Sequence, residues 1–593
     1  MRVADYIADY IYSKIGTDTI FLVPGGGSMF LTDGIKCHPH LKYVCCHHEQ
    51  AASMAASGYA RYTGKVGVCS TTSGVGGTNA ITGVLDAYQD NVPLMVISGQ
   101  IKRKETISRC GLKLRQFGVQ EANIIPIVES ITKYAVMVNE PEKIRYHLER
   151  ATYEATKNPP GPVWLDIPLD VQATKIDDSS LEPYVPEKEK KFCPTNELSE
   201  CACLINQSKR LIIIAGHGII LAKAVEEFRK FIEENQIPVV ESELGMEVLP
   251  YDHPLNFGKI GTKGMRAANF AVQNADLILA IGSRLSVCTT GQDYELFGRE
   301  AKKIVVDINA EEHKKKTVKI DLFLQMDAKD FIETINFVVF PKIDKNWVPK
   351  CQEWKQKWPT YQPEFVQTEK VNLYYFMEML NQKLKTDSVL VGDAGSSCFV
   401  LTQGIKLREK QRLILSAAQT CMGFVIPTCV GISIAKKGEA IGIVGDGSFQ
   451  MNIQELQTIV HHNLPIKLFV WNNEGYLTMR NTQNNFFKGL IGADKESGIS
   501  FPSFKGIADA YGIKYMLAPN SKSLPTVIQD VLDYNGPVIC EVLCLYDQKI
   551  LTVSSKQLPD GTFVSRPLED MAPFLPREEF LREMIVIPTE SSR

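Results

Sequence analysis

Short runs of β-branched and other apolar residues recur along the whole chain and alternate with amphipathic segments. Clear examples are Val66–Thr72, Arg210–Gly216 and Ala440–Asp446. Such runs are apolar on both faces, as expected of strands that helices cover on both sides. Strands that alternate with helices form parallel sheets, so the pattern predicts an α/β protein with doubly wound sheets.

Two segments rich in proline and charge, Glu182–Glu197 and Phe340–Phe365, interrupt this alternation. Division at these linkers predicts three α/β domains of broadly similar size. The chain has 593 residues, which is enough for three or four domains of about 150 residues each. The predicted bounds are 1–181, 190–340 and 366–550, followed by a tail at 551–593.

The composition argues against several classes of function. The net charge of −3 gives no sign of the excess of positive charge that is typical of nucleic-acid-binding proteins. No run approaches the roughly 20 apolar residues of a membrane span, so no membrane association is expected. Fifteen scattered cysteines without a CxxC pair indicate reduced thiols in a cytoplasmic protein rather than a disulfide framework.

The most informative motif is the turn Gly445-Asp446-Gly447-Ser448, which directly follows an apolar run. Apolar residues at 449, 453, 456, 459 and 460 predict a helix after it, from Phe449 to Val460. A strand–turn–helix of this kind directs backbone N–H groups and the positive end of a helix dipole toward an anion. Since the Asp446 carboxylate would repel a phosphate, the turn predicts a divalent cation between them, and Mg²⁺ suits such oxygen ligands.

A second metal ligand is expected from the next apolar run, which ends at Asn473. Its amide supplies a hard oxygen, and the backbone carbonyl of Gly475 can add another. Taken alone, each motif is equally well explained as a tight turn or a helix cap without a ligand. The two motifs together favour a metal site formed by Asp446, Asn473 and Gly475.

Together these motifs resemble the diphosphate–metal site of thiamine-diphosphate-dependent enzymes. Nearly all of the chain is similar to the acetohydroxyacid (acetolactate) synthase group of that family. The segments that carry the resemblance are Phe21–Phe30, His48–Lys65, Thr72–Gly83, Pro160–Gln172 and Cys421–Pro427. The resemblance implies a pyrimidine-binding domain, a central domain and a diphosphate-binding domain. It also implies a cofactor shared between two chains, and therefore a homodimer or homotetramer.

The resemblance assigns roles to individual residues. Glu49 is the implied activating carboxylate, which hydrogen-bonds the aminopyrimidine of the cofactor. Gln120 and Gly26 are implied near the reacting centre, where glycine allows close approach of the backbone. Arg284 is implied as a flavin contact, although members without FAD share the central fold. The other implied cofactor-binding residues are Ser396, Ser397, Met422, Gly445, Asp446, Gly447, Ser448, Asn473, Gly475 and Tyr476.

The implied reaction is a carboligation in which a 2-oxo acid, pyruvate, loses carbon dioxide and gives its two-carbon acyl unit to a carbonyl acceptor. Val119 and Thr482 stand where authentic acetolactate synthases carry aromatic residues, and Arg480 and Asn481 precede Thr482. Loss of two aromatic side chains, with the polar groups of Arg480, Asn481 and Thr482 in their place, predicts a larger, more polar acceptor such as a keto-sugar nucleotide, unless both segments are surface variation. Hydrolysis of a cyclic dione, simple decarboxylation and a catalytically inactive homologue are the alternatives.

A second cluster of potential metal ligands is Cys45-Cys46-His47-His48. Neighbouring side chains of a strand point to opposite faces, so these four cannot all converge on one ion. A zinc site is therefore not expected there.

Overall fold

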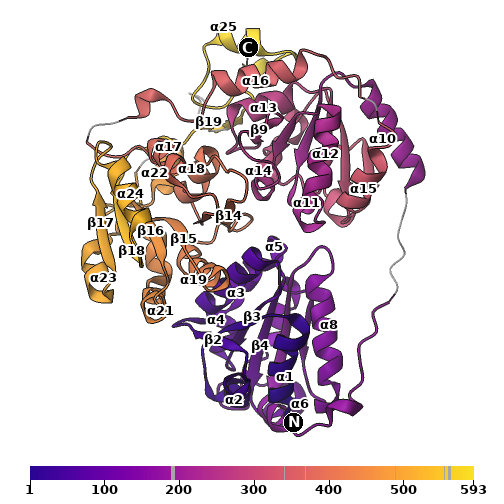
Figure 1. The fold of residues 1–593 in the computed structure, drawn as a ribbon, viewed down its shortest axis with the longest axis vertical. Coiled ribbons are helices and arrows are strands. Elements are labelled where there is room, and N and C mark those ends of the chain that lie inside the picture. The colour runs from indigo at the N-terminus through magenta and orange to yellow at the C-terminus, as the bar shows by residue number, and fades with distance from the viewer. Residues whose placement is uncertain are drawn as a thin grey trace.

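The computed structural model describes residues 1–187, 194–339, 341–366, 369–487, 489–552, 555–557 and 563–592. These residues form three parallel six-stranded sheets flanked by helices, which confirms the predicted α/β class with three domains. The predicted bounds at 190, 340 and 593 lie outside the described residues. Figure 1 shows the first domain below, the third domain at the left and the central domain at the upper right.

The first sheet has the strand order β2-β1-β3-β4-β6-β5. Every residue of its two middle strands, β3 and β4, is buried, as the apolar runs predict. Its strands are β1 (Thr19–Leu22), β2 (Lys42–Cys45), β3 (Gly67–Thr71), β4 (Leu94–Gln100), β5 (Tyr134–Met137) and β6 (Pro162–Pro168). Its helices are α1 (Val3–Tyr10), α2 (Met29–Cys37), α3 (Glu49–Thr63), α4 (Val75–Asn79), α5 (Ile81–Gln89), α6 (Ile107–Cys110), α7 (Ile124–Val128), α8 (Ile144–Thr156) and α9 (Leu169–Ala173).

The central sheet has the order β12-β11-β10-β7-β8-β9, so the direction of winding reverses between β7 and β10. Such a reversal opens a crevice at the carboxyl ends of the strands, where ligands of doubly wound folds bind. Its strands are β7 (Leu211–Ala215), β8 (Val239–Glu241), β9 (Asn256–Lys259), β10 (Leu277–Ile281), β11 (Lys302–Asp307) and β12 (Leu322–Gln325). Its helices are α10 (Thr195–Gln207), α11 (His217–Leu221), α12 (Val225–Asn235), α13 (Arg266–Gln273), α14 (Val287–Thr290), α15 (Ala328–Ile335) and α16 (Trp347–Lys357).

The third sheet has the order β14-β13-β15-β16-β18-β17. Its strands are β13 (Val389–Gly392), β14 (Arg412–Leu415), β15 (Ala440–Gly445), β16 (Ile466–Asn472), β17 (Lys514–Ala518) and β18 (Val538–Leu543). Its helices are α17 (Leu373–Lys383), α18 (Ser396–Gly404), α19 (Val425–Lys436), α20 (Asp446–Phe449), α21 (Leu456–His461), α22 (Leu477–Phe486), α23 (Phe504–Tyr511) and α24 (Leu524–Asp533).

The single helix predicted from Phe449 to Val460 is wrong. The chain forms α20, a 3-10 segment and α21, and Asn452 has the non-helical angles φ −146° and ψ 35°. The buried Asn452 amide donates to the carbonyl oxygen of Gly423 at 2.8 Å. This contact with a neighbouring loop gives a physical reason for the break, because side-chain bonds to nearby backbone compete with helix formation.

The first and third domains share one hydrophobic core through α3 and α19. The two helices approach so closely that a β-carbon at Gly431 would lie 1.9 Å from the Ala55 carbonyl oxygen. Beside this contact, the Arg61 guanidinium forms ion pairs with Asp86 at 2.7 Å and Asp90 at 3.1 Å. Asp90 in turn accepts backbone N–H bonds from residues 417 and 418 of the third domain. The interface is therefore closely packed and charge-matched.

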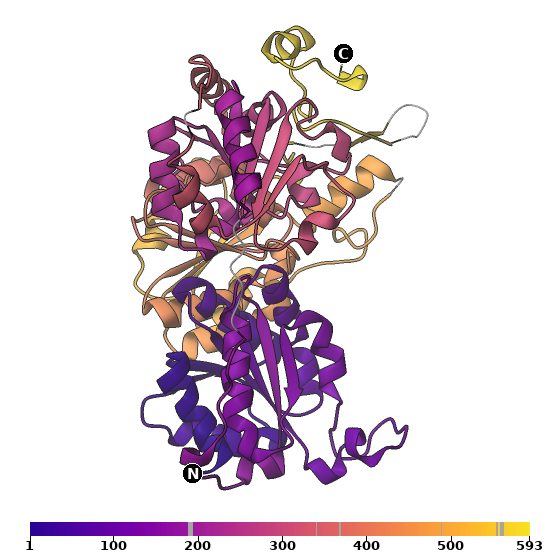
Figure 2. The ribbon, with the colours of Figure 1, turned by 90° about the vertical axis from the view of Figure 1, so that its right-hand side faces the viewer.

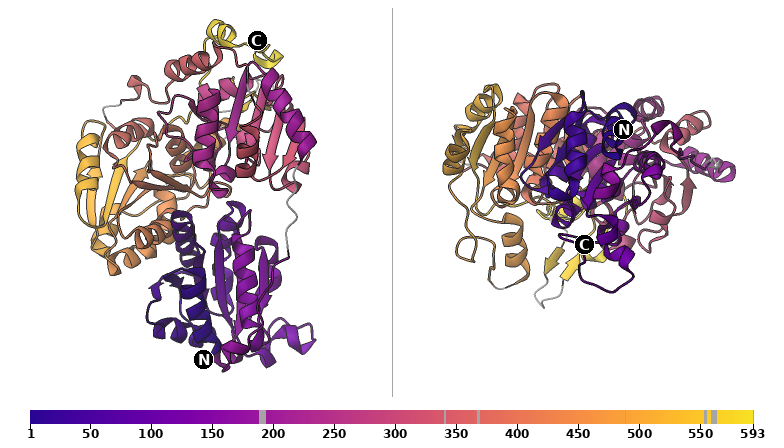
Figure 3. Two further views of the ribbon diagram at one scale, coloured as in Figure 1. Left: turned by 45° about the vertical axis from the view of Figure 1, so that its right-hand side comes forward. Right: turned by 90° about the horizontal axis from the view of Figure 1, so that it is seen from below.

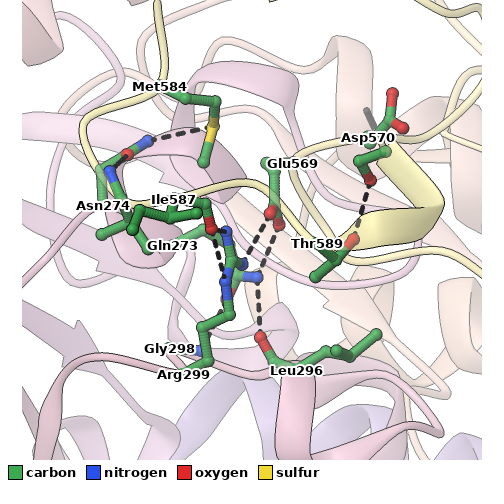
Figure 4. Close-up of polar contacts among 12 residues, drawn as sticks. Gln273, Asn274, Leu296, Gly298, Arg299, Glu569, Asp570, Met584, Ile587 and Thr589 are labelled. Carbon is green, nitrogen blue, oxygen red and sulfur yellow. Dashed lines mark hydrogen bonds and ion pairs between the residues drawn. The ribbon is translucent and has the colours of Figure 1, made fainter. Parts of the chain in front are cut away.

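The C-terminal tail returns to the central domain, as Figures 2 and 3 show at the end of the molecule opposite the first domain. Its helix is α25 (Arg577–Glu583), and it also forms the hairpin β19 (Ser555–Gln557) and β20 (Phe563–Ser565). Glu569 binds Arg299 at 2.7 Å and Gln273 at 2.6 Å, while Asn274 accepts from two tail amides. Figure 4 shows these contacts. Within the described ranges, no helix has both the length and the apolar character to cross a membrane.

Candidate active site

The three predicted catalytic residues approach the segment Thr72–Gly77. This segment follows β3 and includes the first residues of α4. Glu49 is the first residue of α3 and is buried, with 8% of its surface exposed. Its Oε2 accepts a hydrogen bond from the Asn79 side chain at 2.9 Å. A β-carbon at Gly76 would lie 3.4 Å from its Oε1. One carboxylate oxygen is thus held in place while the other faces the glycine turn.

Gly26 and Gln120 approach the same segment from two different loops. The backbone N–H of Gly27 donates to the Thr72 hydroxyl at 3.1 Å, and a β-carbon at Gly26 would meet nothing within 4 Å. Gln120 has a positive φ of 59°, and its carbonyl oxygen packs against Gly74. The structure therefore brings together the three predicted catalytic residues of the first domain. Their catalytic roles remain predictions.

The predicted metal ligands lie where β15 and β16 end. The Asp446 carboxylate is 2% exposed and accepts backbone N–H bonds from Gly447, Asn473 and Gly475. Burial raises the pKa of Asp446 to about 6. The Asn473 Oδ1 atom is also buried and has no hydrogen-bond partner in the described part of the chain. An unsatisfied oxygen beside a buried carboxylate is costly without a cation, so the donor set fits Mg²⁺.

Tyr476 and Gly447 fix the shape of the turn beside this metal set. A β-carbon at Gly447 would lie 2.0 Å from the Tyr476 ring, so no larger residue fits there. Ser448 follows Gly447 at the start of α20 and is also buried. The turn thus keeps its backbone close to the space that the predicted diphosphate would occupy.

A cavity of about 700 Å³ opens at the reversal point of the central sheet. All three domains contribute to its walls, and Arg284 is part of its lining. Arg284 also donates to the Gln89 carbonyl oxygen of the first domain at 2.9 Å. Arg284, the predicted flavin contact, thus lines a large cavity, and its role in binding remains a prediction.

Glu49 and Asp446 are not joined within this single chain. Among the described residues, no hydrogen bond or ion pair links the Glu49 cluster to the Asp446 turn. The domains are linked nearby through Glu455, whose Oε1 accepts backbone N–H bonds from His47 at 2.9 Å and His48 at 3.1 Å. In the described ranges, no three His, Cys, Asp or Glu side chains gather as a metal cluster.

Comparison with known protein families matches three successive segments to thiamine pyrophosphate enzymes. Residues 1–116 match the N-terminal TPP binding domain, 198–335 the central domain and 393–542 the C-terminal TPP binding domain. The chain is 33% identical to the acetolactate synthase large subunit of Lactococcus lactis subsp. lactis (strain IL1403) over 548 residues, which cover 91% of this chain and 92% of that protein. The chain belongs to the thiamine-diphosphate enzymes of the acetolactate synthase type.

Two further relatives extend the similarity to an archaeon and a plant. The chain is 31% identical to the probable acetolactate synthase large subunit of Methanocaldococcus jannaschii over 552 residues, covering 89% of each chain. It is 30% identical to the chloroplastic acetolactate synthase of Arabidopsis thaliana over 575 residues, covering 94% of this chain and 83% of that protein. This thiamine-diphosphate enzyme is therefore a transferase of the acetolactate synthase type.

One residue of the enzyme that sequence reasoning missed is Asp393. Its buried carboxylate accepts a hydrogen bond from the Ser397 hydroxyl at 2.7 Å and another from the Ser448 hydroxyl. Ser448 also accepts the backbone N–H of Gly423, next to Met422, at 2.8 Å. Asp393 therefore ties together the three loops predicted to hold the cofactor. The pair Gly392-Asp393 at the end of β13 was the available signal, since it repeats the glycine–aspartate pair that precedes Ser448.

The remaining predicted cofactor residues lie on these loops. Ser396 and Ser397 are buried at the start of α18, and Met422 is half-buried in the segment before α19. In this structure the hydroxyls of Ser397 and Ser448 support the loops through Asp393. Their contact with the diphosphate, and the wedge role of Met422 between the cofactor rings, remain predictions.

Arg480 was expected to present a polar group to the acceptor, and this expectation is corrected. The side chain is 2% exposed, and its guanidinium donates to the carbonyl oxygens of Asn473 at 2.8 Å and Tyr546 at 2.9 Å. It thus supports the loop of the predicted metal ligand Asn473. Thr482 and Val119 are exposed, Val119 by 82%.

Proposed function

We propose that this enzyme decarboxylates pyruvate and transfers the two-carbon acyl unit to a carbonyl acceptor. The observation that carries the proposal is the geometry of Glu49. Its Oε2 is fixed by Asn79, and Oε1 is directed to the glycine turn at Gly76. A buried carboxylate with one oxygen held and one available is suited to exchange a proton with a bound heterocycle.

Thiamine diphosphate, when bound, supplies the electron sink that decarboxylation of a 2-oxo acid requires. Asp446 and Asn473 would hold the diphosphate through Mg²⁺, with the Gly475 carbonyl as a further ligand. The open backbone at Gly26 allows a small carbonyl compound to approach. The Gln120 side chain would orient the reacting molecules from the facing loop.

For the acceptor, a second 2-oxo acid is the proposal that the relatives support, because they are named acetolactate synthases. One argument for the larger acceptor predicted from the sequence, a keto-sugar nucleotide, no longer applies, since Arg480 is buried against backbone carbonyls. The exposed Thr482 and Val119 are the remaining support for it. Neither the cyclic dione hydrolase nor the simple decarboxylase gains an observation that favours it.

The test is mass spectrometry of the products from isotopically labelled pyruvate, supplied alone and then with a panel of 2-oxo acids and keto-sugar nucleotides. We expect a labelled acetolactate-type product that requires both thiamine diphosphate and Mg²⁺. Glu49→Gln should lower product formation about 10²- to 10⁴-fold, and Glu200→Gln, on the surface of the central domain, serves as the control. Release of unlinked acetaldehyde, or full turnover by Glu49→Gln, would overturn the proposal.

We further propose that two chains complete each site and that the enzyme is a homodimer or homotetramer. The family resemblance supports this arrangement, because it implies a cofactor shared between two chains. A mixture of Glu49→Gln and Asp446→Asn chains tests it. At a cofactor concentration too low for either variant alone to be active, random exchange of subunits should give about a quarter of the wild-type activity, because half of the dimers are mixed and each has one intact site. No recovery after verified subunit exchange would contradict it.

We also propose that FAD binds the cavity of the central domain and that the protein is cytoplasmic. The reversal of strand order and the cavity of about 700 Å³ support nucleotide binding there. Every cysteine that the structure describes is a free thiol, which suits a reducing compartment. A visible spectrum of the purified enzyme tests the flavin, and fractionation of the source cells tests the location.

A further inference from the structure

The residue that follows Gln120 is a buried glutamate, Glu121, whose carboxylate accepts three backbone hydrogen bonds. Its Oε1 accepts the N–H of Ile107, and its Oε2 accepts the N–H groups of Phe117 at 3.0 Å and Gly118 at 3.2 Å. Burial of a carboxylate is costly unless its oxygens are paired, and hydrogen bonds to a charged acceptor are stronger than those between neutral groups. The carboxylate therefore holds these three amides firmly.

The three amides belong to the two ends of one loop, residues 107–118, which includes α6 at the lower end of the first domain (Figure 1). The loop has little packing of its own, since Leu112, Leu114 and Phe117 are exposed. A segment with few buried apolar contacts depends on its hydrogen bonds for a fixed shape. The Glu121 carboxylate joins the two ends of the loop and thereby holds it in this shape.

Glu121 also helps to fix the conformation of Gln120. The positive φ of Gln120, 59°, persists in a residue other than glycine only where neighbouring contacts hold it. On the C-terminal side the chain is anchored to β4, because the Gln100 side chain donates to the Ala122 carbonyl oxygen at 2.9 Å. On the N-terminal side the anchor is the loop that Glu121 closes. The Gln120 carbonyl oxygen then packs against Gly74, in the turn after β3.

We infer that Glu121 is a positioning residue for transfer of the two-carbon unit, and that it acts by fixing the loop that holds Gln120 beside the turn after β3. The inference rests on the proposed carboligase reaction, in which the two-carbon unit has two outcomes once carbon dioxide has left. Transfer forms a carbon–carbon bond to the acceptor carbonyl, whose oxygen takes up a proton. Release instead places a proton on the two-carbon unit and gives acetaldehyde. A fixed Gln120 that orients the acceptor favours transfer, so a loosened loop should shift the products toward acetaldehyde.

The test measures the ratio of acetolactate-type product to acetaldehyde that the enzyme, loaded with thiamine diphosphate and Mg²⁺, forms from labelled pyruvate. Glu121→Gln keeps the size of the side chain but leaves only one oxygen to accept, so one end of the loop is released. The ratio should fall about 10-fold, the effect expected for loss of one charge-assisted hydrogen bond, while the affinity for thiamine diphosphate stays within a few-fold of wild type. Hydrogen exchange of the peptide that covers residues 107–118, measured without substrate, should become faster by about the same factor.

A second variant, Ile107→Pro, removes one donor and leaves the carboxylate unchanged. Proline suits this position, because Ile107 is the first residue of α6 and Thr106 before it is extended, with ψ 141°. Ile107→Pro should therefore reproduce the shift in products, and Ile107→Val, which keeps the N–H, is its control. Glu105→Gln is the control for Glu121→Gln, because it makes the same substitution just before the loop in a side chain that is 42% exposed. Thermal melting of each variant shows whether it is folded.

Three results would overturn the inference alone. They are an unchanged product ratio in Glu121→Gln despite faster hydrogen exchange, an equal fall of both products, and unchanged hydrogen exchange in the loop. The first would mean that the loop does not act on transfer, the second that Glu121 has only a general structural role, and the third that Glu121 does not fix the loop. Absence of any acetolactate-type product from the wild-type enzyme would instead overturn the carboligase proposal, and this inference with it.

Discussion

The first and third domains have the same strand order but carry different chemistry at equivalent strand ends. The orders β2-β1-β3-β4-β6-β5 and β14-β13-β15-β16-β18-β17 correspond strand by strand. In each domain a long helix, α3 or α19, precedes a central strand, β3 or β15. A glycine-rich turn follows that strand. The two helices then pack against each other.

The chemical difference is the position of the carboxylate. In the first domain the carboxylate, Glu49, begins the helix, and the turn Thr72–Gly77 is uncharged. In the third domain the carboxylate, Asp446, lies in the turn, and the segment before the helix carries Met422. The predicted roles therefore assign a proton-exchanging acid to one copy of this topology and a cation-binding acid to the other. The fold places the loops, and the residue types decide their chemistry.

Replacement of the first carboxylate should have the largest effect. Glu49→Gln keeps the size of the side chain and removes its capacity to exchange a proton, so turnover should fall by about 10²- to 10⁴-fold. Affinity for thiamine diphosphate should stay within a few-fold of wild type. Steady-state kinetics and calorimetry measure the two quantities. A loss of affinity as large as the loss of turnover would show that the two carboxylates do not have different roles.

Replacement of the second carboxylate should have the opposite signature. Asp446→Asn removes the charge that would hold the cation, so the affinity for thiamine diphosphate in the presence of Mg²⁺ should fall by about 10²-fold. Saturating cofactor should restore part of the turnover. Calorimetric titration at several Mg²⁺ concentrations measures the effect. Normal affinity with low turnover would contradict the assignment.

The close contact between the two helices predicts a loss of stability. Gly431→Ala places a methyl group where Ala55 leaves no space, so the free energy of unfolding should fall by about 1–3 kcal/mol. Gly438→Ala is the control in the loop after the same helix, because a β-carbon there would meet no atom closer than 3.8 Å. Urea unfolding compares the two variants. Equal stability of both would mean that the domain contact adjusts freely.

The smallest effect is expected at Asp393, which supports the cofactor loops without being a predicted ligand. Asp393→Asn weakens its hydrogen bonds with Ser397 and Ser448, so the affinity for thiamine diphosphate should fall about 10-fold, as for other outer-shell partners. Asp387→Asn is the control in the same domain, because its side chain is 67% exposed. Unchanged affinity in Asp393→Asn, measured by calorimetry, would refute this role.

The sequence was sufficient to predict the α/β class, the three domains and the turn Gly445–Ser448 at the end of β15. Strand periodicity and a turn are local properties, and the pattern from Ala440 to Ser448 contains both. The helix break at Asn452 and the hydrogen bonds that Asp393 accepts from Ser397 and Ser448 were not predictable in this way. Both depend on contacts between loops that lie far apart in the chain, namely the bonds of Asn452 to Gly423 and of Asp393 to Ser448.

Arg480 shows a second limit of prediction from sequence, which concerns the direction of a side chain. Its place just after the metal motif suggested contact with the substrate, because a charged residue beside a site is expected to face it. The structure instead buries the guanidinium against the carbonyls of Asn473 and Tyr546. Proximity in sequence indicated the correct loop but could not show toward which side of it the side chain points.

The returning tail has a mechanical consequence. The third domain is joined to the central domain at its start by the connector near α16, and at its end by the tail that binds Arg299 and Asn274. The chain therefore closes a loop between these two domains. A single proteolytic cut in either connector would therefore leave the third domain attached to the central domain through the other connector.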